Sequence, residues 1–191
     1  MHSKTCLIPF SPTWLTTILH CFNLDTVYMP LGCGRKKFLY QAVKPTISWP
    51  EARAEKVNDS EHWAHFIYKD IICRFGCIPL LKTDGGSEFK GAVDILFKQY
   101  GIVAILLSPY PPQANRIIEQ AHKMLMNSMF CVCSDKTNLW PTYLHPALAA
   151  YHCIVLRVTG YTLYFLLYGQ QAFFAFEYAD CTWDLLDWHA I

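Results

Sequence analysis

The chain has few charged residues and almost no net charge. Only 16% of its 191 residues are charged, and the formal net charge is +1. Proteins that bind nucleic acid nonspecifically usually carry a strongly basic face, so bulk charge does not by itself indicate a nucleic-acid partner. Hydrophobic residues make up 53% of the chain, which is high for a soluble domain. A chain of this length can bury a sizeable core as one domain.

Patterns typical of several other protein classes are missing. The sequence shows no internal repeat, no low-complexity segment, no phosphate-binding glycine-rich loop and no Ser-His-Asp arrangement. Pro9 and Pro12 interrupt the segment in which a signal peptide would need a continuous apolar run. The nine cysteines are an odd number, which favours reduced thiols in a nuclear or cytosolic protein.

One uncharged stretch, residues 158–176, is long enough to span a membrane by length alone. Gly160 and Gly169 interrupt it, and two glutamines follow the second glycine. We interpret the stretch as a buried helix followed by a loop, and we expect no membrane partner.

Hydrophobic periodicity predicts an alternation of strands and helices after an irregular lead-in. Strands are expected over residues 22–29, 38–43, 47–51, 78–82 and 102–107. Helices are expected over residues 60–76, 87–101, from 113 or 114 to 131, 139–157 and 161–168. Ser60 and Ser87 are predicted to cap the first two helices, and Gly76 and Gly101 to end them. The apolar run 102–107 is expected to lie centrally in a covered sheet.

Three acids stand at positions where the predicted elements could bring them together. Asp25 lies in the first strand, Asp84 follows the strand 78–82, and Glu119 lies on a later helix. Clustered carboxylates repel one another unless they bind a cation or take up a proton. Oxygen ligands with open positions suit Mg²⁺, and a pair of such ions suits attack on a phosphodiester.

Each acid also has a purely structural interpretation. Asp25 fits a half-exposed strand position, and Asp84 fits a turn before two glycines. Glu119 could pair with Lys123 one helical turn later, which would contribute a few tenths of a kcal/mol, about 0.2–0.5. The three acids together, and not any one of them, indicate the metal site.

Ten short motifs, in a fixed order and spacing, carry a family resemblance. They are Leu24–Pro30, Ser48–Arg53, Asp70–Gly76, Thr83–Phe89, Tyr100–Ile102, Ser108–Asn115, Glu119, Trp140–Pro141, Thr159–Tyr161 and Tyr168–Gly169. With these motifs the chain resembles the integrase catalytic core of gypsy-type long-terminal-repeat retrotransposons, within the retroviral integrase superfamily. The resemblance implies an α/β, ribonuclease H-like fold with a mixed five-stranded sheet flanked by helices. It also implies a lead-in over 1–20, a catalytic core over 21–170 and a tail over 171–191.

The resemblance further implies a metal-dependent polynucleotidyl transferase that joins retroelement DNA ends to target DNA. Asp25, Asp84 and Glu119 would be the catalytic ligands of two Mg²⁺ or Mn²⁺ ions. The helix that carries Glu119 begins with amide and guanidinium side chains, which suit contact with DNA phosphates. The expected nucleic-acid-binding residues are Gln113, Asn115, Arg116 and Lys123. A homo-oligomer in the nucleus, or in the cytoplasm before import, is expected.

The sequence departs from the family pattern at several motif positions. Gly85 stands where the family usually has Asn, Pro111 replaces a His, Arg116 replaces a Gly, Gln120 replaces an Arg, and Leu163 replaces a Pro. Scattered changes of this kind are typical of a degenerate element copy. One alternative is therefore a catalytically inactive, element-derived domain that binds nucleic acid or self-associates. Another is a ribonuclease H-like nuclease that only hydrolyses DNA or RNA.

A zinc site was considered for His62, His65, Cys73 and Cys77. All four lie on one predicted helix, along which they would extend over roughly 22 Å. One ion cannot collect ligands spread that far, because each must approach to about 2 Å. The sequence therefore predicts no zinc site here.

Overall fold

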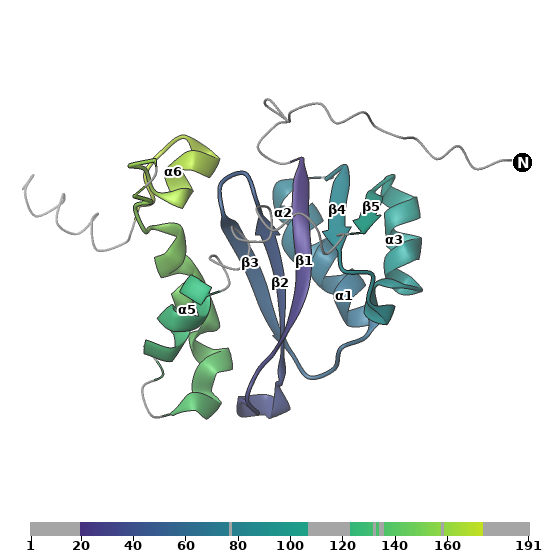
Figure 1. Cartoon of the computed structure of the whole chain (residues 1–191), viewed down its shortest axis with the longest axis horizontal. Helices are drawn as coiled ribbons and strands as arrows, with labels where there is room; N and C mark the ends of the chain where they lie inside the picture. Colours follow the sequence, from purple (N-terminus) through teal and green to yellow (C-terminus); the bar gives the residue numbers. More distant parts are fainter. Residues whose placement is uncertain are drawn as a thin grey trace, which may run out of the picture.

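The computed structural model describes residues 20–76, 78–106, 123–131, 133, 136–157 and 159–173. These residues form one five-stranded sheet with helices on both faces (Figure 1). The strands are β1 (Cys21–Tyr28), β2 (Phe38–Lys44), β3 (Trp49–Glu55), β4 (Leu80–Thr83) and β5 (Val103–Leu106). Their spatial order is β3-β2-β1-β4-β5.

The sheet combines an antiparallel half with a parallel half. β1 pairs antiparallel with β2, and β2 with β3, whereas β1 pairs parallel with β4, and β4 with β5. The predicted mixed five-stranded sheet is thus confirmed, and the first two strands begin and end within one residue of the prediction. β3 begins two residues later than predicted, because residues 45–48 form a turn in which Ser48 has a left-handed φ of 58°.

The prediction that the apolar run 102–107 is central in the sheet was wrong. β5 lies at the edge, and among the described strands it pairs with β4 alone. Val103 is 55% exposed and Leu106 is 71% exposed. A short apolar run has the same local pattern in either position, so strand order depends on long-range pairing that periodicity does not report.

One helical stretch covers the first face of the sheet, together with α3 (Ala92–Tyr100). The stretch runs through α1 (Ser60–Phe66), the π-helical η2 (Ile67–Ile72) and α2 (Cys73–Phe75). Its N-cap is Asp59 and not Ser60, because the extended Asp59 accepts a 2.9 Å hydrogen bond from the His62 N–H. The Ser60 hydroxyl instead donates to the Lys90 carbonyl and accepts from the Val93 N–H at 3.0 Å.

The second predicted cap was also wrong. Ser87 begins the short 3-10 helix η3 (Ser87–Phe89), and α3 starts after Gly91. Gly76 and Gly101 end their helices as predicted, with φ of 84° and 67°. Glycine reaches these angles without a Cβ clash.

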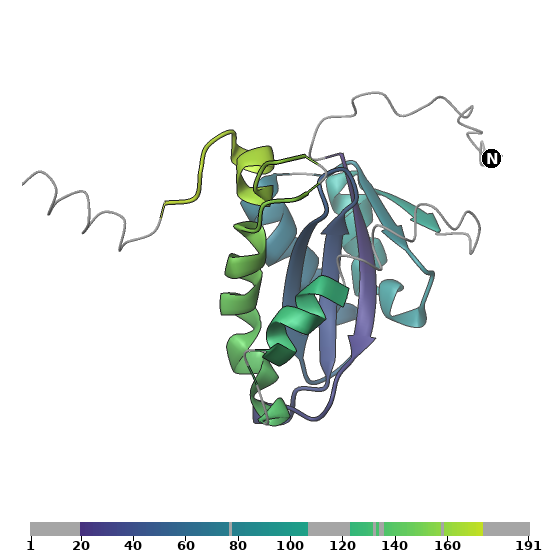
Figure 2. The ribbon, with the colours of Figure 1, turned by 60° about the vertical axis from the view of Figure 1, so that its left-hand side comes forward.

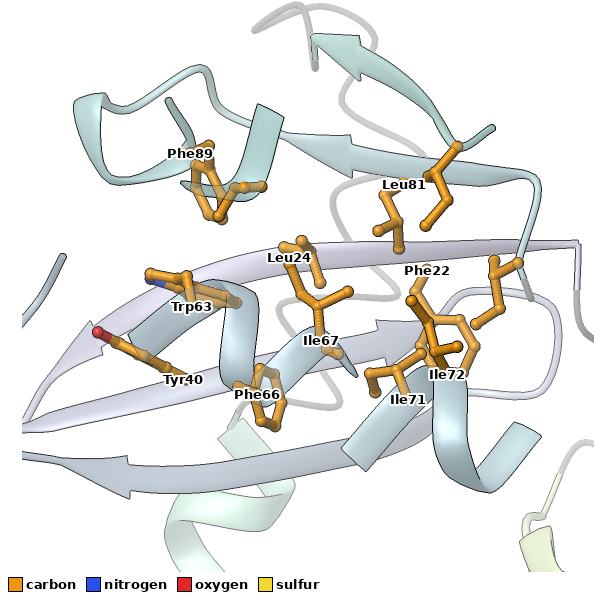
Figure 3. Close-up of a cluster of buried hydrophobic side chains, with 14 of the residues drawn as sticks. Phe22, Leu24, Tyr40, Trp63, Phe66, Ile67, Ile71, Ile72, Leu81 and Phe89 are labelled. Atoms are coloured by element: carbon orange, nitrogen blue, oxygen red, sulfur yellow. The ribbon is translucent and has the colours of Figure 1, made fainter. Parts of the chain in front are cut away.

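The core of the first face is dense and aromatic (Figure 3). Trp63 lies beneath Tyr40, and their ring centroids are 4.2 Å apart at an interplanar angle of 15°. Phe22 and Leu24 of β1 point into the same cluster, as does Leu81 of β4. Burial raises the pKa of the Tyr40 hydroxyl, which donates to the Val57 carbonyl at 2.6 Å.

Helices from the C-terminal half of the chain cover the second face (Figure 2). The helical residues 123–131 and α5 (Trp140–His152) pack on this side, and α5 follows the 3-10 helix η4 (Thr137–Leu139). Leu125 and Met129 are fully buried against β2 and β3. The last helix among the described residues is α6 (Leu163–Tyr168), and the hydroxyl of its N-cap residue, Thr162, accepts a hydrogen bond from the Phe165 N–H.

The C-terminal helices are shorter than predicted. α5 ends at His152, and the connection to α6 folds back through an isolated antiparallel bridge between Val155 and Thr162. None of the described helices is long and apolar enough to cross a membrane. The predicted lead-in and tail fall almost entirely outside the described residues, so those boundaries remain predictions.

Three contacts join sequence motifs that are far apart in the chain. Arg53 pairs with Asp70 at 2.7 Å, and Arg74 pairs with Glu51 at the same distance. Burial raises the pKa of Glu51, and the nearby Arg74 opposes this effect. In addition, the Trp140 indole N–H donates a hydrogen bond to the backbone carbonyl of Pro30 at 2.8 Å. These motifs therefore hold β3 to the first helical stretch and α5 to the end of β1.

Candidate metal and nucleic-acid site

Two of the three predicted acids lie just beyond the paired residues of the parallel strands β1 and β4. In this pair Asn23 lies opposite Lys82. The pairing ends there, and Asp84 is the first residue after β4. The same register, continued by two residues, would bring Asp25 level with Asp84 at the spacing of neighbouring strands, about 4.7–4.9 Å.

Asp84 opens a tight turn. Its Oδ1 accepts the Gly86 N–H at 3.0 Å, and the Thr83 hydroxyl accepts the Gly85 N–H at 3.3 Å. Gly85 has a φ of 81°, and a Cβ at this position would lie 2.6 Å from Cδ2 of Leu106. Asp84 is nevertheless exposed, so its carboxylate is accessible from solvent as well as serving the turn.

Asp25 projects from the second face of the sheet. Leu24 belongs to the first-face core and Val27 packs against the second-face core, and alternate residues of a strand point to the same side. Asp25 is half-buried. Its cross-strand neighbour is Gln41, and Asn23 lies two residues before it on the same side.

A polar cluster ties the turn that follows Asp84 to β1. Glu88 Oε1 accepts hydrogen bonds from the Asn58 amide at 3.2 Å and from the Thr26 hydroxyl at 3.4 Å. Asn58 Oδ1 in turn accepts from the Trp63 indole at 3.0 Å. Because Thr26 directly follows Asp25, this cluster fixes the Asp84 turn relative to the strand that carries Asp25.

The remaining predicted site residues are described only in part. Gln113, Asn115, Arg116 and Glu119 lie outside the described residues. Lys123 is exposed at the start of the helical residues 123–131, which pack on the same face of the sheet from which Asp25 projects. The structure places Asp25 and Asp84 on neighbouring strands, just beyond their paired residues, and the metal site formed with Glu119 remains a prediction.

The donor set at the two acids fits a hard divalent cation. Carboxylate oxygens are the ligands that Mg²⁺ prefers, and a site with two protein carboxylates leaves positions for water or phosphate. Within the described part of the chain, no group of three or more His, Cys, Asp or Glu residues could hold a metal ion. The two histidines of the zinc set weighed from the sequence have other neighbours: His62 contacts Asp59 at 2.6 Å and His65 contacts Arg53 at 2.8 Å.

Comparisons with known proteins were made in sequence and in structure. No family model matches the chain, and no curated protein matches it in sequence. In structure, the catalytic core domain of BIV integrase superposes with a TM-score of 0.65 and 21% identity, over 78% of this chain and 93% of that one. The fold is that of a retroviral integrase catalytic core.

A second solved structure gives the same result. It is the intasome of simian T-cell lymphotropic virus, solved in complex with PP2A regulatory subunit B56 gamma. A chain of this structure matches with a TM-score of 0.68 and 19% identity. The match covers 78% of this chain but 54% of the intasome chain. The predicted ribonuclease H-like α/β fold is confirmed, and at these identities the likeness concerns the fold alone.

Sequence reasoning missed three polar residues around the acids. Glu88 lies inside a recognised motif, four residues after Asp84, but nothing local shows that it contacts β1. Asn58 precedes the N-cap by one residue and gives no separate signal. Gln41 is the residue of the three that the sequence could have indicated, because no other residue of the predicted strand 38–43 except Tyr40 carries a polar side-chain group.

Proposed function

We propose that this chain is an integrase catalytic core that joins retroelement DNA ends to target DNA by metal-dependent polynucleotidyl transfer. The observation that carries the proposal is the parallel pairing of β1 and β4, whose register, continued by two residues, would make Asp25 and Asp84 neighbours. It occurs in a fold shared with retroviral integrase cores, where the carboxyl ends of parallel strands offer a ligand site.

The proposed ligands are Asp25, Asp84 and Glu119. Glu119 precedes Lys123 by four residues, and the helical residues 123–131 pack on the face from which Asp25 projects. Two Mg²⁺ or Mn²⁺ ions bound by these carboxylates would stabilise the charge on the attacking and leaving oxygens of the phosphodiester. Glu88 and Asn58 support the site by fixing the turn that presents Asp84.

The proposed DNA contacts are Gln113, Asn115, Arg116 and Lys123. Lys123 is exposed and can approach a phosphate without losing a partner in the core. Contacts of this kind position the protein on DNA without reading its sequence. The chain would act as a homo-oligomer in the nucleus, or in the cytoplasm before import.

We further propose that the chain derives from a gypsy-type element and is a degenerate copy. Gly85, one of the departures from the family pattern, does not disturb the local fold. A glycine suits the left-handed φ of the turn after Asp84 and leaves room for the Leu106 side chain. The competing proposals are a catalytically inactive domain that binds nucleic acid or self-associates, and a nuclease that cleaves without joining.

A branched DNA that mimics an integration product tests the proposal in the presence of Mn²⁺ or Mg²⁺. The parent chain is expected to reverse the branch and rejoin the target strand, whereas Glu119→Gln and Asp84→Asn lose this activity. The matched control is Glu61→Gln, because Glu61 is an exposed acid on α1, away from the second face.

The outcomes separate the three proposals. Rejoining by the parent and the control, but not by the two site variants, supports the transferase. Cleavage without joining would indicate a nuclease. A folded parent that binds DNA and shows neither reaction would indicate the inactive domain.

A further inference from the structure

Two buried amide side chains near Asp25 contain atoms that have no hydrogen-bond partner in the described part of the chain. Gln41 is 0% exposed and Asn23 is 4% exposed. Within the described part of the chain, neither the oxygen nor the nitrogen of the Gln41 amide has a partner, and the same holds for Asn23 Oδ1. Unsatisfied buried polar groups are rare in folded proteins and call for an explanation such as a ligand or a functional partner.

The strand register places both amides next to the proposed metal ligand. Gln41 lies directly across from Asp25, and Asn23 lies across from Val43. Side chains directly opposite each other on one face have Cβ atoms about 4.5–5.5 Å apart, and diagonal neighbours remain within reach of long side chains. Gln41 can therefore reach Asp25 directly and Asn23 diagonally.

The hydrogen-bonding capacities of the three groups are complementary. A glutamine amide nitrogen donates two hydrogens, an ionised carboxylate only accepts, and an asparagine oxygen accepts. Leaving the Gln41 amide unbonded costs stability, whereas one reorientation of its end would satisfy both the Gln41 nitrogen and Asn23 Oδ1.

We propose that Gln41 is a positioning residue for Asp25. Its Nε2 donates one hydrogen to the Asp25 carboxylate and the other to Asn23 Oδ1, so that the carboxylate is held in one orientation toward a divalent cation. This inference rests on the proposed function, because it assigns a partner to one of the proposed metal ligands. Residues that orient metal ligands in this way typically change metal affinity about 10–100-fold when they are replaced.

Gln41→Met separates this role from a mere packing defect. Methionine has a similar length and no polar atoms, so it removes the buried amide with little change of shape. If the amide positions Asp25, the variant binds Mn²⁺ about 10–100-fold more weakly, while the midpoint of thermal unfolding without metal is unchanged or higher. Weaker Mn²⁺ binding without a lower unfolding midpoint cannot result from a simple loss of folding.

The binding of Mn²⁺ is measured with the full chain by the loss of the free-ion electron paramagnetic resonance signal. Leu39→Met is the matched control, because Leu39 is buried on the same strand and face but faces Val27. The expected result is parent-like affinity for Leu39→Met, weakened affinity for Gln41→Met and loss of binding for Asp25→Asn. Equal affinity in both methionine variants would overturn the inference and leave the metal site standing.

Failure of the proposed function would look different. A folded parent whose Mn²⁺ binding is absent, or is unchanged in Asp25→Asn, would overturn the metal site and the inference with it. If Gln41→Met does not fold, the parent alone decides the question. The side-chain ¹⁵N–¹H signals of Gln41 should shift when Mg²⁺ is added to the parent and not when it is added to Asp25→Asn, and a signal that stays in place in the parent would refute the role.

Discussion

The two faces of β1 have different chemistry, although their residues alternate along one strand. Phe22 and Leu24 point into the aromatic first-face core, whereas Asn23 and Asp25 project from the opposite side. Alternation with a period of two lets one short strand serve both layers. The comparison teaches that the first face of β1 supplies apolar core residues, whereas the second face carries the polar residues of the proposed site.

The hydrogen bonding of buried polar atoms differs between the faces in the same way. On the first face, the Trp63 indole donates to Asn58 and the Tyr40 hydroxyl donates to the Val57 carbonyl. On the second face, the Gln41 amide has no partner among the described residues. Satisfied polar groups stabilise a core, and unsatisfied ones reduce stability unless a ligand engages them. These hydrogen bonds of Trp63 and Tyr40 therefore add to the stability of the first face.

The largest expected effect follows from removing the centre of the first face. Trp63 is fully buried and stacks on Tyr40, so Trp63→Ala leaves a cavity and breaks the bond to Asn58. We expect a loss of about 3–5 kcal/mol in the free energy of unfolding, measured by urea denaturation. Trp63→Phe keeps part of the packing and should lose clearly less. If Trp63→Ala cost under about 1 kcal/mol, the first face would not be the main source of stability.

The second prediction uses pH to weaken the helix that covers the second face. His152 at the end of α5 stacks on Trp49 with ring centroids 3.6 Å apart, and it contacts the Pro50 carbonyl at 2.8 Å. Burial lowers the pKa of His152 from 6.5 to about 4. The unfolded chain therefore binds the proton more readily, and stability is lost as the pH falls from 6.5 toward 4, by on the order of 2–3 kcal/mol.

Local and global measurements check this prediction together. Amide hydrogen exchange should accelerate in α5 at pH 5 relative to pH 7, after correction for the intrinsic rate, before it does so in α1. His152→Phe should remove this pH dependence. The raised pKa of the buried Glu51 contributes with the opposite sign, because its protonated form is favoured in the fold, so the difference between the parent and His152→Phe is the relevant quantity. If the exchange rates in α5 depended on pH in the same way in the parent and in His152→Phe, the role of His152 would be refuted.

The third prediction concerns the turn between the two faces. Gly85 has a φ of 81°, and an added Cβ would meet Leu106 at 2.6 Å. A left-handed backbone costs roughly 1–2 kcal/mol for a residue with a Cβ, so Gly85→Ala should destabilise the chain by about that amount. Leu106 is an exposed side chain, and Gly85→Ala combined with Leu106→Ala should recover only the part due to the clash. Full recovery in the double variant would mean that backbone strain is negligible, contrary to this prediction.

Much of this architecture was predictable from local sequence signals. Alternating apolar residues gave β1 and β2 to within one residue, and glycines marked the ends of two helices. The N-cap was misplaced because Asp59 and Ser60 are equally good caps by residue type. The choice between them depends on the contact of Ser60 with the loop before α3, which is tertiary.

The candidate site was only partly predictable for a similar reason. The residue types and motif order single out Asp25 and Asp84, but their proximity depends on the register of two strands that are far apart in sequence. The edge position of β5 was missed because sheet order is also a long-range property. The contacts of Glu88 and the unpartnered amide of Gln41 became visible only once the strands were paired.

The smallest expected effect on stability is also the strictest comparison of the two faces. Asp25 directly follows Leu24, but it projects from the second face and is half-buried there. Asp25→Asn keeps the shape of the side chain and removes its charge, so the free energy of unfolding without metal should change by less than about 1 kcal/mol. Mg²⁺ should raise the unfolding midpoint of the parent and not of Asp25→Asn, because a ligand stabilises only the form that binds it. A large loss of stability in Asp25→Asn without metal would show that this residue serves the fold, and the division between the two faces would fail at its central position.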